Sequence, residues 1–239
     1  MIILALLASF ILGMAKAGLK GMGIVIVTLM AIVYDARMST GILLPMLVVA
    51  DIIAVIYYNR HTQRKYLFKF LPWMIIGVLL GVVVGKYMPD ELFRNSMAVI
   101  ILISVVLMFY NEKIHRSGIA QKTWFAAFMG IAAGFTTMVG NLAGAFANIF
   151  FLSTRIPKNE FIGTAAWLFF IVNVFKVPFH VFYWGTINID TLKINLQLLP
   201  MIFIGFFAGV KLVSKIKDAH YRIFILVMTA LGALVLLIR

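Results

Sequence analysis

Long apolar runs alternate with short polar connections along the whole chain. Runs long enough to cross a hydrocarbon core of about 30 Å lie at 41–58, 68–86, 95–110, 161–183, 196–213 and 222–238. Two further runs, 2–34 and 124–153, are too long for one simple crossing and are interrupted near their middles. This pattern predicts an all-α integral membrane protein, with residues 1–239 forming a single transmembrane domain.

Glycine-rich interruptions mark the two longest runs. The first is interrupted at Lys16–Gly23 and the second at Gly134–Asn141. Because glycine weakens a helix interior by roughly 1 kcal/mol relative to alanine, each run is expected to form either one kinked helix or two shorter helices in a V. Non-helical backbone inside a bilayer is tolerated only in protein or beside a wet cavity. The interruptions therefore predict a central site, and half-helix N-termini there would favour anions.

The same residues recur at the same spacings in two stretches 128 residues apart. The first set is Leu71, Pro72, Gly77, Gly81, Asp90, Phe93 and Arg94, and the second is Leu199, Pro200, Gly205, Gly209, Asp218, Tyr221 and Arg222. Such a repeat predicts a duplicated unit, with one repeat over about 1–112 and the other over about 122–239. Each repeat is expected to hold about four to five membrane segments.

The charge of the connections predicts their side of the membrane. Counting Lys and Arg against Asp and Glu, the net charge is +4 in 59–70, +2 in 111–123, +1 in 154–160 and +3 in 211–222. It is zero in 86–95 and in 185–195. If cytoplasmic connections are the basic ones, the run 124–153 must enter the membrane and return. The two repeats would then be inverted relative to each other.

Composition supports the membrane assignment. The chain is 64% hydrophobic and only 12% charged, whereas a soluble domain has roughly 25% charged residues. The net charge of +13 comes mostly from the short connections, so we attribute it to topology and expect no nucleic-acid partner. Residues 1–15 lack a basic n-region and a cleavage site and are expected to be a retained membrane segment. Cysteine is absent, which excludes disulfides and thiolate chemistry.

Three charged residues lie in apolar surroundings in the first half. Lys16 and Lys20 flank the first interruption; they either line an anion path or extend toward headgroups or water. Asp51 lies in the middle of an apolar run, where a carboxylate is costly unless it is paired or protonated. We consider it a proton carrier, an ion-pair partner for a lysine, or a cap on a broken helix.

Polar residues also gather at the second interruption. Thr136, Thr137 and Asn141 lie there among glycines, and this clustering favours ligand or pore lining over contacts between helices. Asn148 follows two turns later and is expected to join helices.

The run 161–183 carries its own polar positions. Lys176 has apolar sequence on both sides, so we expect a buried cation that faces an anion cavity, with an ion pair to Asp51 as the alternative. Asn173 is one turn earlier and is assigned to the same site. Trp167 is either a cavity wall or a lipid-facing or packing surface.

No pattern in the chain indicates catalysis. His61 and His180 lack metal-ligand companions at suitable spacing, and no phosphate-binding loop or metalloprotease motif occurs. We therefore expect no enzymatic activity, no metal and no cofactor.

Several motifs together resemble the sulfite exporter TauE/SafE family of membrane permeases over nearly the whole chain. They lie at 13–23, 50–51, 71–81, 134–144 and 157–179. The resemblance implies transport of a small sulfur-containing anion, such as sulfite or an organosulfonate. The expected protein is a multi-pass inner-membrane secondary transporter coupled to protons, with the anion and the lipid bilayer as its partners; no oligomeric state is assigned. The alternatives are a channel-like anion permease and, from another class, a membrane scaffold or a subunit of a larger enzyme.

Overall fold

The computed structural model describes residues 1–93, 95, 96, 99, 100, 103, 122–217, 220, 221, 223–225 and 227. Its main helices are α1 (Ile2–Lys16), α2 (Gly23–Tyr34), α3 (Ala36–Tyr58), α4 (Arg64–Tyr87), α6 (Thr123–Gly140), α7 (Gly144–Thr154), α8 (Lys158–Pro178) and α9 (Ile189–Ser214). A 3₁₀ turn (Asn59–His61) extends α3, and a π-helical turn (Phe179–Tyr183) extends α8. The described ranges contain no strand, and five of their helical segments are long and apolar enough to cross a membrane. The predicted all-α membrane fold is confirmed.

Part of the predicted organisation lies outside the described residues. This concerns most of the runs 95–110 and 222–238 and nearly all of the connection 111–123. Arg94, Asp218 and Arg222 of the repeated motif are outside as well.

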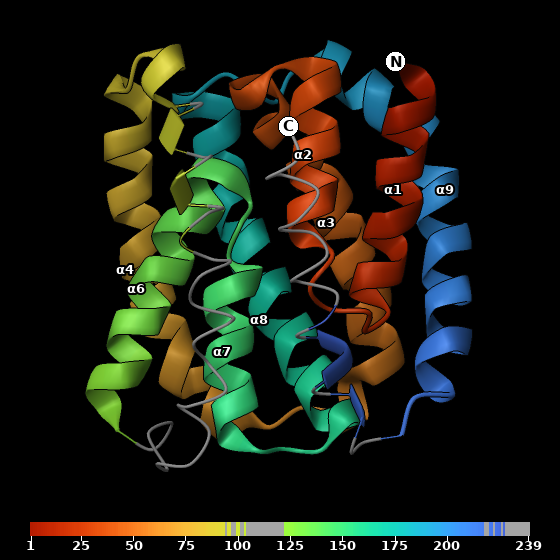
Figure 1. The fold of residues 1–239 in the computed structure, drawn as a ribbon. Helices are drawn as coiled ribbons and strands as arrows, with labels where there is room; N and C mark the ends of the chain where they lie inside the picture. The colour runs from red at the N-terminus through yellow and green to blue at the C-terminus, as the bar shows by residue number, and fades with distance from the viewer. Residues whose placement is uncertain are drawn as a thin grey trace.

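Each interrupted run folds as two separate helices rather than one kinked helix. Helices α1 and α2 enter from one end of the molecule and turn back within it, and α6 and α7 do the same from the opposite end (Figure 1). The first break spans residues 17–22, where Gly18 and Gly21 have φ angles of 124° and 99°. Such angles are accessible to glycine but strained for other residues. The second break spans 141–143 and begins at Asn141, which has a φ angle of 56°.

The prediction placed the second break too early. Helix α6 continues through Gly134 and ends only at Gly140. A Cβ atom at Gly134 would collide with the backbone of Met74 and Val78 on α4. Gly134 therefore allows close packing between α6 and α4. For this reason it is part of a continuous helix and not the start of the break.

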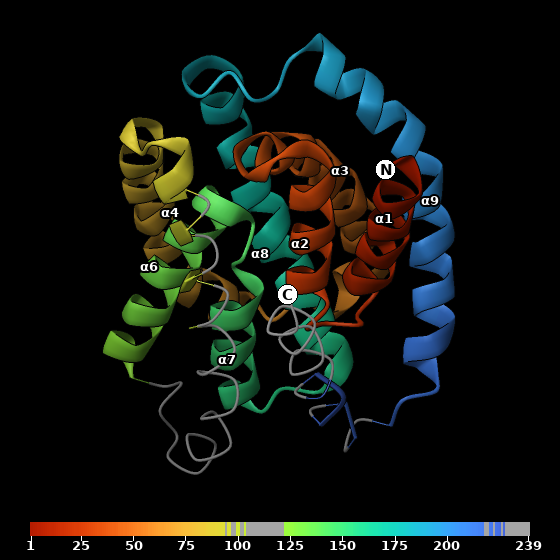
Figure 2. The ribbon, with the colours of Figure 1, turned by 45° about the horizontal axis from the view of Figure 1, so that its top comes forward.

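The two ends of the molecule differ in charge. One end carries the turns at 59–63 and 154–157 together with residues 214–217, and we call it the basic end because Arg60, Arg64, Arg155, Lys158 and Lys215 gather there. The other carries residues 34–36, 87–88 and 184–188, and we call it the neutral end (Figures 1 and 2). The described parts of 59–70, 154–160 and 211–222 thus share one end, as the loop charges predicted, whereas nearly all of 111–123 lies outside the described residues.

Two helix pairs, α4 with α6 and α1 with α9, pack through corresponding residues. Gly134 of α6 meets the backbone of Met74 and Val78, and Gly13 of α1 meets the backbone of Ile202 and Phe206. Ile202 and Phe206 each follow their counterparts on α4 by 128 residues, the spacing of the sequence repeat. The small residues of the repeat thus build the same kind of interface twice.

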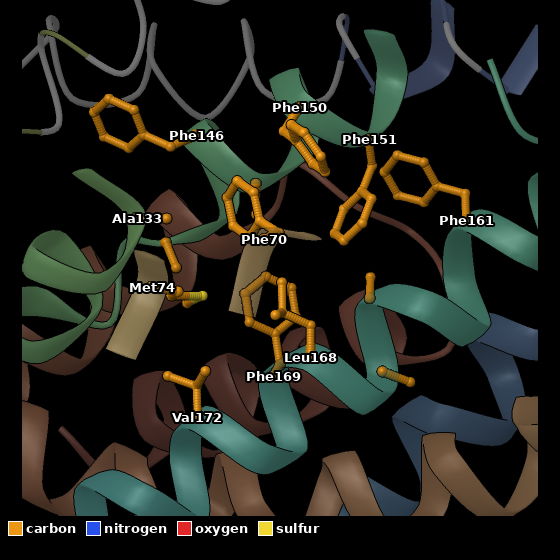
Figure 3. Close-up of a cluster of buried hydrophobic side chains, with 14 of the residues drawn as sticks. Phe70, Met74, Ala133, Phe146, Phe150, Phe151, Phe161, Leu168, Phe169 and Val172 are labelled. Atoms are coloured by element: carbon orange, nitrogen blue, oxygen red, sulfur yellow. The ribbon is translucent and has the colours of Figure 1, made fainter. Parts of the chain in front are cut away.

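An aromatic cluster packs the basic half of the molecule behind the second break. Phe70 of α4 stacks on Phe150 of α7 with ring centroids 4.5 Å apart, and Phe151 packs edge-on against Phe161 of α8 at 5.7 Å (Figure 3). Such ring pairs contribute about 0.5–1.5 kcal/mol each beyond the area they bury. The cluster fixes α7 against α4 and α8, and so fixes the position of the second break.

Candidate anion site between the two breaks

A cavity of about 90 Å³ lies where the two breaks meet. One wall is polar and consists of Lys16, Lys20, Thr137, Asn141, Asn148 and Asn173. The other is apolar and consists of Leu12, Ile26, Leu43, Leu47 and Phe169. The lining comes from both halves of the chain, as expected if broken helices from each half converge on one site.

Two helix N-termini face this cavity. Helix α2 begins at Gly23 and α7 begins at Gly144, and both glycines line the cavity. Apart from the adjoining residues of the same helix, no atom lies within 4 Å of the place where a Cβ of either glycine would stand. The first backbone N–H groups of a helix lack intrahelical acceptors and carry partial positive charge. Both ends are therefore open to a bound anion.

Lys16, at the end of α1, pairs with the most deeply buried carboxylate among the described residues. Its Nζ lies 2.5 Å from Oδ1 of Asp51, and Nδ2 of Asn173 donates to the other carboxylate oxygen at 2.7 Å. Asp51 itself is 0% exposed and does not line the cavity. Both oxygens of the carboxylate thus have a donor, as a buried charge requires.

Lys176 is fully buried on α8, and only neutral oxygens hold it. Its ammonium donates to Oδ1 of Asn141 at 2.6 Å, to Oγ1 of Thr137 at 3.1 Å and to Oδ1 of Asn173 at 3.4 Å. Within the described part of the chain no carboxylate lies within 4 Å of it. The predicted alternative, an ion pair between Lys176 and Asp51, is therefore wrong. Asp51 forms its ion pair with Lys16 instead.

Lys20 and Lys16 approach the same aromatic ring. Their Nζ atoms lie 5.7 Å and 4.9 Å from the centre of the Phe169 ring. Cation–π contacts of this kind contribute about 0.5–2 kcal/mol, more when water is excluded. Among the described residues, the Lys20 ammonium has no hydrogen bond and no ion pair.

The cluster contains more basic than acidic groups. Three lysine side chains, those of Lys16, Lys20 and Lys176, are buried together with one carboxylate, that of Asp51. An uncompensated charge in a low-dielectric interior costs several kcal/mol. A small anion in the cavity would reduce this cost, and the two helix N-termini add to the attraction.

The structure brings together most, but not all, of the predicted site residues. Lys16, Lys20, Thr137, Asn141 and Asn173 line the cavity. Lys176 lies one layer behind it and positions Thr137 and Asn141 rather than lining it.

Besides Lys176, two more predicted residues, Thr136 and Trp167, are not part of the cavity lining. The Thr136 hydroxyl donates to carbonyls of its own helix, at Ala132 and Ala133. Trp167 lies near the basic end, where its Nε1 donates to Oδ1 of Asn59 at 3.0 Å and its ring lines a separate hollow. It points there because Trp167 and Asn173 lie six residues apart, on different faces of α8.

Sequence reasoning did not assign several lining residues to the site, Asn148 and Phe169 among them. Asn148 was expected to join helices, yet it lines the cavity, and its buried Oδ1 has no hydrogen-bond partner. Its spacing of four residues from Gly144 was the available signal, since that spacing places both on one face of a helix. Phe169 gave no signal, because one phenylalanine among many apolar residues is indistinguishable from packing.

Comparisons with known proteins match this architecture to one family. The family model described as Sulfite exporter TauE/SafE matches residues 1–236. Searches of curated proteins and of solved structures returned no match to the chain.

Proposed function

The chain belongs to the sulfite exporter TauE/SafE family and is a multi-pass membrane protein, and we propose that it is a proton-coupled secondary transporter for one small sulfur-containing anion. The observation that carries this proposal is the cavity between the two breaks, which joins two lysines to two open helix N-termini. A membrane scaffold needs neither broken helices nor buried excess charge at mid-membrane.

The size and walls of the cavity support a compact anion. A cavity of about 90 Å³ is small, and this favours a single oxyanion group with a short organic part over a bulky organic anion. Lys16, Lys20 and Asn148 offer donors to the charged oxygens, while Leu43 and Leu47 offer an apolar wall. Sulfite and short organosulfonates both meet these conditions.

The inverted-repeat organisation is part of the proposal. It is supported by the matching contacts of α4 with α6 and of α9 with α1, and by the two broken elements that enter from opposite ends. Movement of one half against the other around a fixed central site would then expose the cavity to each side in turn.

We place the basic end in the cytoplasm, following the positive-inside rule. Single cysteines in this cysteine-free chain test the assignment, one at Asn59 or Lys158 at the basic end and one at Gly185 at the neutral end. Membrane-impermeant reagent should label the first two only from the cytoplasmic side and the third only from outside. Labelling of Asn59 and Lys158 from opposite sides would refute the topology.

Asp51 is the proposed proton carrier. It is the only carboxylate in the central cluster of described residues, and it is isolated from water. A buried carboxylate whose partner lysine also faces the substrate cavity is suited to link proton binding to anion binding.

Uptake into proteoliposomes tests the transport function. Wild-type protein should take up at least one of labelled sulfite, thiosulfate, sulfate and sulfoacetate, and unlabelled anion on the far side should accelerate uptake, as it does for carriers but not for channels. Lys193→Met is a suitable control, because Lys193 pairs only with exposed Asp190 at the neutral end. Absence of flux for every anion would favour the scaffold, and flux without such acceleration would favour the channel.

A further inference from the structure

We propose that Lys16 exchanges partners during transport: it pairs with Asp51 when the carboxylate is charged and with the transported anion when Asp51 is protonated. This inference rests on the proposed function and goes further, because it fixes the sign of coupling. Anion and proton would bind together and cross the membrane in the same direction.

The position of Lys16 carries the inference. Its ammonium lies in the lining of the cavity and also 2.5 Å from Oδ1 of Asp51, which is outside the lining. One ammonium therefore stands between two sites for negative charge. The Asp51 carboxylate and an anion in the cavity compete for it, and each disfavours the other by like-charge repulsion at short range.

No other described group can replace Lys16 as the cationic partner of Asp51. Lys20 lines the cavity but makes no hydrogen bond to the carboxylate, and Lys176 is held by Thr137 and Asn141. Asn173 donates to Oδ2 of Asp51 through a neutral amide, and this hydrogen bond does not require a charge on the other oxygen.

The remaining elements packed against α3 contribute no charge at this position. Helices α2 and α6 contain no charged residue, and the charged residues of α9 are exposed. Other titratable groups lie around the cluster. The hydroxyls of Tyr58 and Tyr221 donate to the carbonyls of Ala17 and Gly18, and His180 pairs with Thr186 one turn beyond Lys176. Tyr34, the titratable residue of α2, is its last residue and lies at the neutral end of the molecule.

The charge balance of the exchange is simple. One proton binds to Oδ1 of Asp51, Lys16 keeps its own proton throughout, and the freed ammonium accepts one anion from the cavity. The net addition is one proton and one anion, so a monovalent anion would cross without net charge movement. Because the two ligands favour each other reciprocally, a proton gradient directed inward drives uptake of the anion, and the opposite gradient drives its release.

Proton uptake on anion binding tests the exchange in purified protein. The probes are methanesulfonate and thiosulfate, which do not titrate in the neutral range, added to weakly buffered protein with a pH indicator. Wild type should take up about one proton per bound anion, and its affinity should fall by up to about tenfold per pH unit once Asp51 is charged. Asp51→Asn imitates the protonated state, so it should bind the probes with no proton uptake, with a pH-independent affinity about tenfold tighter than that of alkaline wild type.

Controls separate this inference from the proposed function. Asp190→Asn removes an exposed carboxylate and should behave as wild type, and Asp51→Asn in vesicles should exchange anion without accumulating it along a pH gradient. If wild type binds neither probe at any pH, the proposed function fails at this site. If wild type binds a probe without proton uptake, the exchange is refuted while the anion site stands. That second measurement needs no variant, so it can refute the exchange even if Asp51→Asn does not fold.

Discussion

The two breaks share one architecture but differ in chemistry. Lys16 and Lys20 stand at the first break, and Thr137 and Asn141 stand 121 residues later at the second. The glycines that pack the adjacent helices, Gly13 and Gly134, have the same separation. Corresponding positions are thus cationic in the first half and neutral in the second.

The long helix beside each break provides a different polar group to it. At the first break α3 supplies the carboxylate of Asp51 to the lysine of the break, whereas at the second α8 supplies the ammonium of Lys176 to neutral oxygens. Among the described residues of this cluster, the only carboxylate comes from the first half. Packing residues thus preserve the shared geometry, while a few polar positions place lysines in the cavity lining and one carboxylate, that of Asp51, directly behind it.

Loss of the ion pair in the first half should have the largest effect. Lys16→Met leaves the Asp51 carboxylate buried without its cation, and breaking one side of a buried pair costs about 3–5 kcal/mol. We expect a marked fall in thermal stability and no anion binding. The double variant Lys16→Met/Asp51→Leu should regain most of the stability but not the binding, as measured by thermal unfolding in detergent. A double variant no more stable than Lys16→Met would show that the pair is not the cause.

Removal of the cation in the second half should affect transport more than folding. Lys176→Met leaves Thr137 and Asn141 without their donor, at a cost of about 1–3 kcal/mol, but it leaves no unpaired charge. The protein should insert and fold, while anion flux should be lost because the excess positive charge falls. If Lys176→Met transports anion into proteoliposomes at the wild-type rate, Lys176 is not needed for transport and the prediction is wrong.

Glycines at the breaks and glycines in the helix interfaces should respond differently to the same substitution. Gly23→Ala and Gly144→Ala place a methyl group in the open cavity, so stability should be retained while flux of the larger anions falls. Gly134→Ala pushes a methyl group into the backbone of α4, and overpacking of this kind costs about 1–3 kcal/mol or more. Unfolding temperatures and relative uptake of sulfite and sulfoacetate distinguish the two responses. Equal destabilisation of all three variants would contradict the cavity.

The smallest effect is expected at Trp167. Trp167→Phe removes the hydrogen bond to Asn59 near the basic end, which contributes about 0.5–1.5 kcal/mol. Anion affinity should stay within a factor of two of wild type, in ligand titrations of the purified variant. A large loss of affinity would place this side chain in the site after all.

Local chemistry made the breaks and the sorting of the connections predictable from sequence. Clustered glycines located two interruptions, each expected to be one kinked helix or two helices in a V. The basic connections 59–70 and 154–160 were expected on one side, and they lie at one end of the molecule. The partners of buried charges were not predictable in this way. Asp51 pairs with Lys16 rather than Lys176 because of how α1 and α8 are rotated against α3, which depends on packing between residues far apart in the chain.

Glycine roles were ambiguous for the same reason. Gly134 and Gly144 belong to one motif in the sequence, yet the first packs against a helix and the second opens onto a cavity. Only the position of α4 separates the two cases. Asn148 was likewise assigned to packing, because its distance from the first break cannot be read along the chain.

The central claim is that one small anion binds between the N-termini of α2 and α7. Anomalous diffraction from crystals grown with selenite, a heavier analogue of sulfite, locates the bound anion directly. The account predicts a selenium peak in the cavity beside Gly23 and Gly144, within reach of the ammonium groups of Lys16 and Lys20. A selenium peak elsewhere in the molecule, with this cavity empty, would contradict it.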